Sequence, residues 1–185
     1  GGLDKLGDGA HAEQLGDAFR AINPYCTVPV LELDDGTRLL SSAGCCRYLE
    51  EAFPEPPLMG RTSEEKAIVA DMEWRMEIDG FMAAGEALRN YAKRLENRAM
   101  VGPDDYAQIP ELAERGRQRA ARFLERLDVI LADREFVAGE VFSIADITAY
   151  CTVDFAKWAK VDVPDDAPNL QRWFAAIAER PSASL

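Results

Sequence analysis

The sequence predicts an α+β fold in which a short mixed segment precedes a long, purely helical one. Three observations lead to this prediction. Strand-like apolar runs occur near the start, a proline-rich break follows at residues 53–57, and beyond it apolar residues recur every three to four positions. A chain of 185 residues is long enough to bury a sizeable core. We place the first domain at residues 1–53, the linker at 54–62 and the helical domain at 63–185.

The first segment is expected to contain an antiparallel hairpin. Residues 28–33 are strand-like, and residues 37–40 supply the returning strand. Asp35 and Gly36 between them are a strong two-residue hairpin signal. Ser41 or Ser42 then serves as the N-cap of a helix that ends before the proline-rich break, which completes a β-β-α unit.

The dipeptide Val28-Pro29 interrupts the first strand. A proline cannot donate a hydrogen bond to a sheet ladder, so the backbone beside it is left partly unpaired. An extended peptide is one partner that could pair with it. The sequence therefore predicts a small-peptide binding surface here.

A long helix is expected after the linker, with Ser63 as its cap. The spacing of its apolar residues breaks phase between Met76 and Phe81, so we expect a bend near Asp79-Gly80; two abutting helices are the alternative. The apolar positions are Ile68, Met72, Met76, Phe81, Ala84, Leu88 and Leu95.

A further helix is predicted by one apolar face, formed by Leu112, Gly116, Ala120, Phe123, Leu127 and Ile130. Its arginines are expected to be largely solvated, because charged residues are normally exposed. These arginines are Arg115, Arg117, Arg119 and Arg122.

Ser143 and Asp146 have the spacing of a capping box, and we assign Asp146 to capping and fold stability. The helix that follows is expected to be the buried centre of the domain, with one stripe formed by Ile147, Cys151, Phe155 and Trp158. A last helix, terminated by Pro181, carries Leu170, Trp173, Phe174 and Ile177.

Composition excludes several functional classes. The formal net charge of −12 and the pI near 4.6 oppose binding to nucleic acid or anionic membranes. No apolar stretch approaches the roughly 18 to 20 residues that span a bilayer. The four cysteines form no CxxC and the single histidine completes no ligand cluster, so we expect no metal site, reduced thiols and a cytoplasmic setting.

In combination and in this order, four segments resemble the cytosolic glutathione S-transferases of bacterial type. They are residues 21–24 leading to Val28-Pro29-Val30-Leu31, residues 39–49, Phe136-Val137-Ala138-Gly139 before Phe142-Ser143-Ile144-Ala145-Asp146, and residues 169–181. The resemblance covers nearly the whole chain. It implies a partial thioredoxin-like first domain and an all-α second domain.

The resemblance also implies a glutathione site. The backbone of Val28 would pair with the cysteinyl unit of glutathione as an added strand, and a cis Pro29 would shape the turn. Thr27 has the neighbouring position, near the glycyl end. Ser42 and the first N–H groups of its helix would receive the γ-glutamyl carboxylate, because a helix N-terminus favours an anion. The alternative for Ser42 is that it only caps the helix.

Two departures from the family pattern concern the chemistry. Ser41 stands where relatives usually carry a glutamate, which is expected to weaken the hold on the glutathione ammonium group. In the family, the first strand, the first helix and the residue that stabilises the thiolate come before the segment with which this sequence begins. The catalytic residue is therefore not identified. His11 is a candidate contact to the glycyl carboxylate, with an exposed loop histidine as the alternative. Cys26 is expected to be an inert loop thiol rather than a site of mixed disulfides.

The second substrate is expected to lie between the domains against the bent helix. Apolar side chains of that helix, together with Trp158, are candidates for an adaptable wall, with ordinary core packing as the alternative. The candidates are Trp74, Met76, Phe81, Tyr91 and Trp158.

The expected function is conjugation of the glutathione thiolate, as co-substrate, to a hydrophobic electrophile. A non-catalytic glutathione transferase-like binding or interaction module is an alternative, as is a lyase, dehalogenase or isomerase on the same scaffold. The resemblance also implies a homodimer.

Overall fold

The computed structural model describes residues 13–184. The chain divides into two compact units. One contains residues 13–55 and the loop Ala92–Gln108, and the other contains Pro56–Tyr91 and residues 109–184. The predicted domain limits placed residues 92–108 with the helices, so the units and those limits differ at this loop. None of the helices within residues 13–184 combines the length and apolar character that crossing a bilayer requires.

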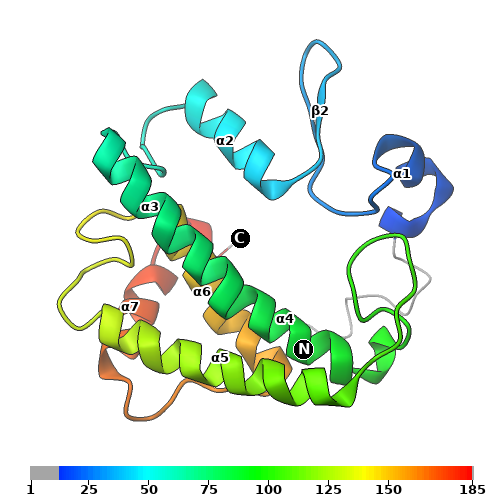
Figure 1. Cartoon of the computed structure of the whole chain (residues 1–185). Helices are drawn as coiled ribbons and strands as arrows, with labels where there is room; N and C mark the ends of the chain where they lie inside the picture. Colours follow the sequence, from blue (N-terminus) through cyan, green and yellow to red (C-terminus); the bar gives the residue numbers. More distant parts are fainter. Residues whose placement is uncertain (1–12, 185) are drawn as a thin grey trace. The chain divides into compact units, whose positions relative to one another are not determined.

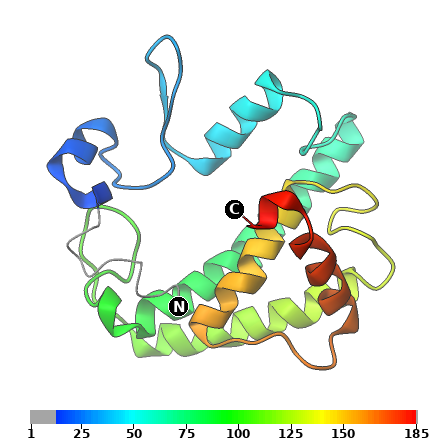
Figure 2. The ribbon, with the colours of Figure 1, turned by 180° about the vertical axis from the view of Figure 1, so that it is seen from behind.

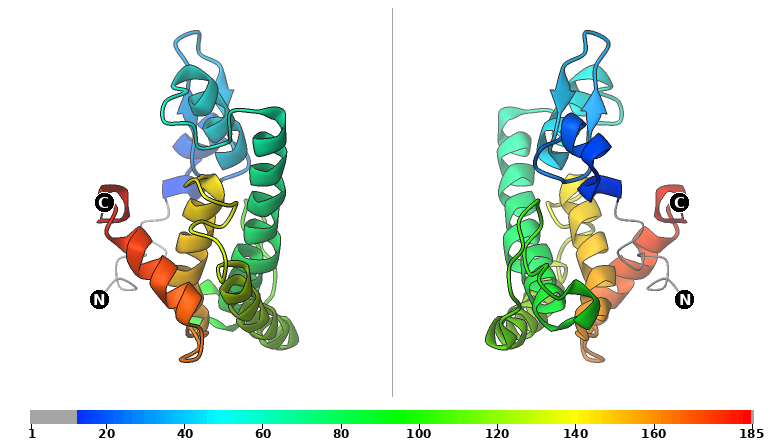
Figure 3. Two further views of the ribbon diagram at one scale, coloured as in Figure 1. Left: turned by 90° about the vertical axis from the view of Figure 1, so that its left-hand side faces the viewer. Right: turned by 90° about the vertical axis from the view of Figure 1, so that its right-hand side faces the viewer.

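The first unit contains the predicted β-β-α order, preceded by two short helical turns. Strands β1 (Leu31–Glu32) and β2 (Arg38–Leu39) pair antiparallel, with Leu31 opposite Leu39; Figure 3 draws them as short arrows. Helix α2 (Ser42–Ala52) follows. The turns η3 (Glu13–Leu15) and α1 (Asp17–Ile22) precede the hairpin and were not predicted.

The hairpin loop has three residues, one more than the two-residue signal of Asp35 and Gly36. Leu33 donates its N–H to the carbonyl of Thr37 at 2.8 Å, which leaves three residues, 34–36, in the loop. Gly36 donates to the Leu33 carbonyl at 2.9 Å and has a φ of 85°. A turn followed by a left-handed glycine is the usual geometry of a three-residue hairpin loop. Both strands are also shorter than expected, since residues 28–30 do not join the ladder.

The second unit is built around one long helical rod, which Figure 1 shows as α3, α4 and the turn between them. Helix α3 (Ser63–Arg75) is capped by Thr62, not by Ser63 as predicted. The Thr62 hydroxyl accepts the Glu65 N–H at 3.2 Å, and the Thr62 N–H donates to the Glu65 carboxylate at 3.3 Å. The rod continues through η4 (Met76–Phe81) into α4 (Met82–Tyr91).

The predicted break in the rod is a π-helical turn, η4. The five-residue step from Met76 to Phe81 matches the i→i+5 hydrogen bonding of a π-helix, which explains why the apolar spacing changes phase there. Gly80 is buried at this turn, where an added Cβ would lie 2.6 Å from the Phe123 ring. The Ile78 carbonyl of the turn accepts a hydrogen bond from Arg119 at 2.8 Å.

Helix α5 (Pro110–Ile130) packs along α4. Gly116 permits their close approach, because a Cβ there would lie 2.5 Å from the backbone nitrogen of Ala87. Two of the arginines predicted to be solvated are only partly exposed. Arg119 pairs with Glu86 at 3.2 Å, and Arg117 lies 4.8 Å from the centre of the Tyr91 ring.

Helix α6 (Ile144–Ala156) lies against α3 and η4, as Figure 2 shows from behind. The capping box of Ser143 and Asp146 is confirmed. The predicted buried stripe is wrong, because Ile147 and Cys151 are exposed. The buried face of α6 is formed mainly by small residues, Ala145, Asp146, Ala149, Thr152, Val153 and Ala156. Small side chains allow neighbouring helices to approach closely, which places larger residues outside.

The turn η6 (Lys157–Ala159), helix α7 (Pro168–Ala178) and the turn η7 (Pro181–Ser184) complete the unit. The predicted last helix is confirmed, with Leu170, Trp173 and Ile177 buried. Asp128 of α5 accepts the Leu170 N–H at 2.8 Å and so satisfies one of the free N–H groups at the start of α7.

Candidate glutathione-binding site

The site begins at the peptide bond between Val28 and Pro29, which is cis, as the resemblance implied. Val28 is 70% exposed. Within the described residues, no hydrogen bond occupies the N–H or the carbonyl of Val28. The two groups form a short free edge that can pair with an extended peptide.

Asn23 holds the loop that leads to this edge. Its buried side-chain amide donates to the Thr27 carbonyl at 2.7 Å and to the Thr27 hydroxyl at 3.2 Å. Its oxygen accepts the Tyr25 N–H at 3.0 Å. These bonds fix the loop from both sides of Cys26. Sequence reasoning did not identify Asn23 as a positioning residue, although asparagine before proline is a known turn signal.

Cys26, which was expected to be an inert loop thiol, is buried. The residue is 98% buried, with 2% exposed, and its backbone is in the left-handed region at a φ of 54°. Its sulfur lies 3.8 Å from the Pro24 carbonyl oxygen. The thiol therefore faces inward, away from the surface on which Val28 lies.

The second part of the site is the N-terminus of α2. Ser41 is the N-cap, and its hydroxyl accepts the Gly44 N–H at 3.1 Å. Ser42 is the first helical residue and is exposed, so the reading in which Ser42 only caps the helix is wrong. The N–H groups of Ser42 and Ala43 have no acceptor among the described residues. Free N–H groups at the start of a helix favour a carboxylate.

The remaining candidates for contacts to glutathione are Thr27, Ser41 and His11. Thr27 is half-buried and engaged with Asn23. The Ser41 hydroxyl is occupied as a cap acceptor. His11 lies outside the described residues.

The five candidates for the substrate wall fall into three groups. Trp74 is 58% exposed and Phe81 is also exposed, with its ring stacked on Phe155 at 5.2 Å. Met76 is 2% exposed and is a core residue. Tyr91 and Trp158 are half-buried, and the Tyr91 hydroxyl donates to the Trp158 carbonyl at 2.9 Å. Trp74 and Phe81 are therefore the candidates most accessible to a ligand.

A carboxyl group with an altered pKa lies between α3 and α6. Burial raises the pKa of Glu73 above its ordinary value of 4.5, although a hydrogen bond from Thr148 at 2.7 Å acts in the opposite direction. The neighbouring charge of Glu77 also raises it. The second carboxyl oxygen is buried, with no hydrogen-bond partner within residues 13–184. Sequence reasoning did not identify this residue.

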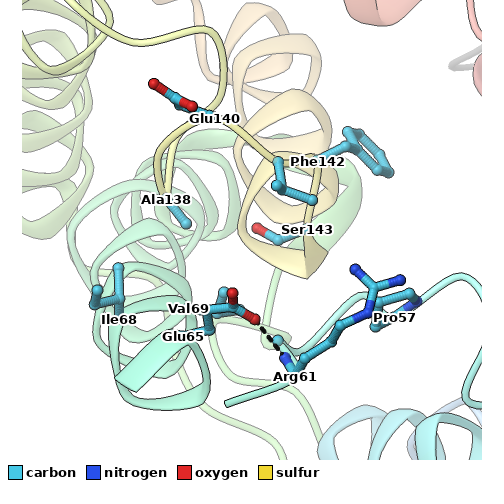
Figure 4. A pocket seen from close by; sticks show the side chains of 11 residues that line it. Pro57, Arg61, Glu65, Ile68, Val69, Ala138, Glu140, Phe142 and Ser143 are labelled. Atoms are coloured by element: carbon cyan, nitrogen blue, oxygen red, sulfur yellow. Dashed lines mark hydrogen bonds between the residues drawn. The ribbon is translucent and has the colours of Figure 1, made fainter. Parts of the chain in front are cut away.

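A pocket of about 220 Å³ lies in the helical unit, where the start of α3 meets the loop before α6 (Figure 4). Arg61 and Glu65 lie at its edge, and the backbone N–H of Arg61 donates to the Glu65 carboxylate at 2.7 Å. Its lining includes Ile68, Val69, Val141 and Phe142. None of the predicted site residues lines this pocket.

Comparison with known proteins relates these features to one family. Residues 8–52 match the family profile described as "Glutathione S-transferase, N-terminal domain", and residues 97–181 match "Glutathione S-transferase, C-terminal domain". "Glutathione S-transferase 2" of Saccharomyces cerevisiae is 33% identical over 165 residues, which cover 89% of this chain and 68% of the yeast protein. The chain belongs to the glutathione S-transferase family.

Solved structures of glutathione S-transferases agree with this fold. A glutathione S-transferase domain-containing protein of Marinobacter aquaeolei superposes with a TM-score of 0.83 at 36% identity, covering 95% of this chain and 82% of that one. Gtt2 of Saccharomyces cerevisiae superposes with a TM-score of 0.83 at 31% identity, covering 94% and 81%. The predicted family and fold class are confirmed, and the chain is an enzyme of the glutathione transferase type.

Proposed function

We propose that this glutathione transferase conjugates the thiolate of glutathione to a hydrophobic electrophile. The free edge at Val28, beside the cis bond to Pro29, is the observation that carries the proposal. Glutathione is a tripeptide, and its cysteinyl unit has one N–H and one carbonyl that match this edge as an added strand. Pairing fixes the orientation of the cysteinyl side chain, and a fixed orientation lowers the barrier of a bimolecular reaction.

The γ-glutamyl carboxylate binds at the start of α2 in this proposal. The Ser41 hydroxyl already accepts the Gly44 N–H. The Ser42 hydroxyl and the N–H groups of Ser42 and Ala43 are therefore left for the ligand. Thr27 and His11 are proposed for the glycyl end. Since Ser41 supplies no carboxylate for the ammonium group, the affinity is expected to be modest.

The electrophile is proposed to contact the exposed aromatic residues of the helical unit. Trp74 and Phe81 offer apolar area at low conformational cost, which suits molecules of varied shape. Tyr91 and Trp158 are proposed as a secondary contact. Met76 is left out, because its side chain is buried.

A turnover assay tests this proposal. The purified chain is mixed with reduced glutathione and 1-chloro-2,4-dinitrobenzene, an activated aryl chloride, and formation of the thioether is followed by absorbance. The sulfur–carbon bond forms, the carbon–chlorine bond breaks, chloride leaves and the thiol proton passes to solvent. Conjugation above the uncatalysed rate, lowered in Trp74→Ala, is the expected result. Glutathione binding without turnover on any of several electrophiles would favour a binding module instead.

A homodimer is part of the same proposal, and it rests on the family alone. Light scattering at micromolar concentration measures it directly. A mass near twice the 20.5 kDa of the chain is expected. A mass of one chain would remove this part of the proposal.

A further inference from the structure

The pocket at the start of α3 lies within the helical unit and is separate from the proposed conjugation site. None of the described residues that line it belongs to the glutathione contacts or to the proposed electrophile contacts. Its volume is about 220 Å³. An apolar cavity of about 150 Å³ is enough for benzene, whereas sites for drug-sized ligands start at about 300 Å³. The pocket therefore has room for one ring and a small polar group.

Backbone contacts hold the walls of this pocket. The Ile144 N–H donates to the Leu58 carbonyl at 2.9 Å, which ties the linker before α3 to the start of α6. In the loop before α6, Phe136 and Gly139 exchange two backbone hydrogen bonds, of 2.8 and 3.0 Å. Gly60 has a φ of 90°, and an added Cβ there would lie 2.7 Å from the backbone of α3. Walls that are already fixed bind a ligand without the cost of ordering a loop.

Most of the side chains that line the pocket are apolar. Val69 is buried, while Ile68 and Val141 are at least half exposed. The ring of Phe142 is fixed by two neighbours: the Phe136 ring meets it edge-on at 5.9 Å, and the Arg180 guanidinium lies 3.7 Å from its centre. These side chains offer contact area to a flat ring. The apolar lining residues are Pro57, Ile68, Val69, Ala138, Val141 and Phe142.

Arg61 is the one cationic side chain among the described residues that line the pocket. Figure 4 shows its side chain at the edge of the pocket, extending toward Phe142. The guanidinium of Arg180 on the Phe142 ring adds positive charge on the same side. A ring bound against the apolar lining can therefore place an anionic group on Arg61.

The two carboxylates of the lining are engaged or directed elsewhere. Glu65 accepts the backbone N–H groups of Arg61 at 2.7 Å and Thr62 at 3.3 Å. These two bonds, and then the charge of Arg61, hold the pKa of Glu65 below its ordinary value, so this carboxylate is committed to the start of α3. The carboxylate of Glu140 points away from Arg61 in Figure 4. Neither carboxylate takes the place that we assign to a ligand.

We propose that this pocket binds a small aromatic carboxylate, with its ring against the apolar lining and its carboxylate on the Arg61 guanidinium. A guanidinium and a carboxylate match through two parallel N–H···O hydrogen bonds. A phosphate dianion fits less well, because one lining cation offsets only one negative charge and the apolar walls leave the other uncompensated. The site is independent of the proposed conjugation and does not require glutathione.

Calorimetric titration of the full chain with benzoate tests the proposal, and benzamide is an uncharged probe of the same size. Saturable binding of benzoate is expected. Benzamide on the native chain, and benzoate on Arg61→Gln, are each expected to bind roughly ten- to a hundredfold more weakly, because a hydrogen bond between charged groups is lost. Arg126→Gln is the matched control, since Arg126 is an exposed arginine of α5 outside the pocket. It is expected to keep the native affinity.

Two further variants locate the ligand. Ala138→Leu puts a larger side chain into the pocket and is expected to abolish benzoate binding, with circular dichroism to confirm that the variant is folded. Trp74→Ala, outside the pocket, is expected to bind benzoate as the native chain does. No saturable binding, or equal affinity in Arg61→Gln and the native chain, overturns the proposal. Loss of binding in Trp74→Ala but not in Arg61→Gln also overturns it and assigns benzoate to the electrophile contacts.

Discussion

The carboxylate of Asp146 accepts a hydrogen bond from the indole N–H of Trp173 at 3.0 Å, across 27 residues of sequence. The same carboxylate accepts the N–H of Val137 at 2.9 Å and that of Ser143 at 3.0 Å. It is completely buried. One side chain therefore joins the start of α6 to α7 and to the loop before α6.

Asp146→Ala is expected to lower the free energy of unfolding by about 3–5 kcal/mol, because four buried donors, the Ser143 hydroxyl among them, lose their acceptor together. Urea unfolding measures the effect. Trp173→Phe, which removes one donor, is expected to cost less. An Asp146→Ala protein within about 1 kcal/mol of the native one would show that the network is dispensable.

Gly80→Ala is expected to destabilise the helical unit by about 1–3 kcal/mol, since the new methyl group meets the Phe123 ring. Gly116→Ala is expected to cost more, because its Cβ meets the backbone of α4 rather than a side chain. Gly85, inside α4, has no heavy atom within 4 Å of its built Cβ, so Gly85→Ala is the control. It is expected to stabilise the chain by up to about 1 kcal/mol. Equal thermal midpoints for all three variants would contradict this account.

Stability is expected to fall as pH rises through the range just above 4.5, in part because of Glu73. Burial raises the pKa of this carboxyl in the folded state, so the folded chain holds its proton to a higher pH than the unfolded chain. The contribution of Glu73 to stability is fully present below its pKa in the unfolded chain. It is lost as the pH rises through its pKa in the folded chain. Glu73→Gln should flatten this slope in urea unfolding measured from pH 4 to about 7.

Glu125→Gln, on the exposed face of α5, is the control for this pH series and is expected to keep the native slope. Thr148→Val should enhance the effect, since it removes the hydrogen bond that lowers the pKa of Glu73. A native slope in Glu73→Gln would assign the pH dependence to other groups. One such group is Asp146, whose pKa burial also raises.

The features that the sequence predicts well depend on residues near one another in the chain. The capping box spans Ser143 to Asp146, and the π-helical turn lies where the apolar spacing skips from Met76 to Phe81. The short helix α1 was missed because six residues carry too little periodic signal.

The features that sequence reasoning missed depend on packing between distant segments. The small buried face of α6 follows from close contact with α3 and η4, which no pattern within α6 shows. The donors from Val137 and Trp173 to Asp146, and the grouping of residues 92–108 with the first unit, are likewise long-range. Burial of Cys26 depends on the turn that Asn23 holds.

Glutathione binding at the Val28 edge and the start of α2 is the central claim, and calorimetric titration with reduced glutathione tests it most directly. Saturable binding is expected, and Ser42→Ala should weaken it roughly tenfold through loss of a hydrogen bond to a charged group. Ser63→Ala is the matched control, because Ser63 is likewise the first helical residue after a capping hydroxyl, at the start of α3. No saturable binding, or equal affinity in Ser42→Ala and the native chain, would contradict the claim.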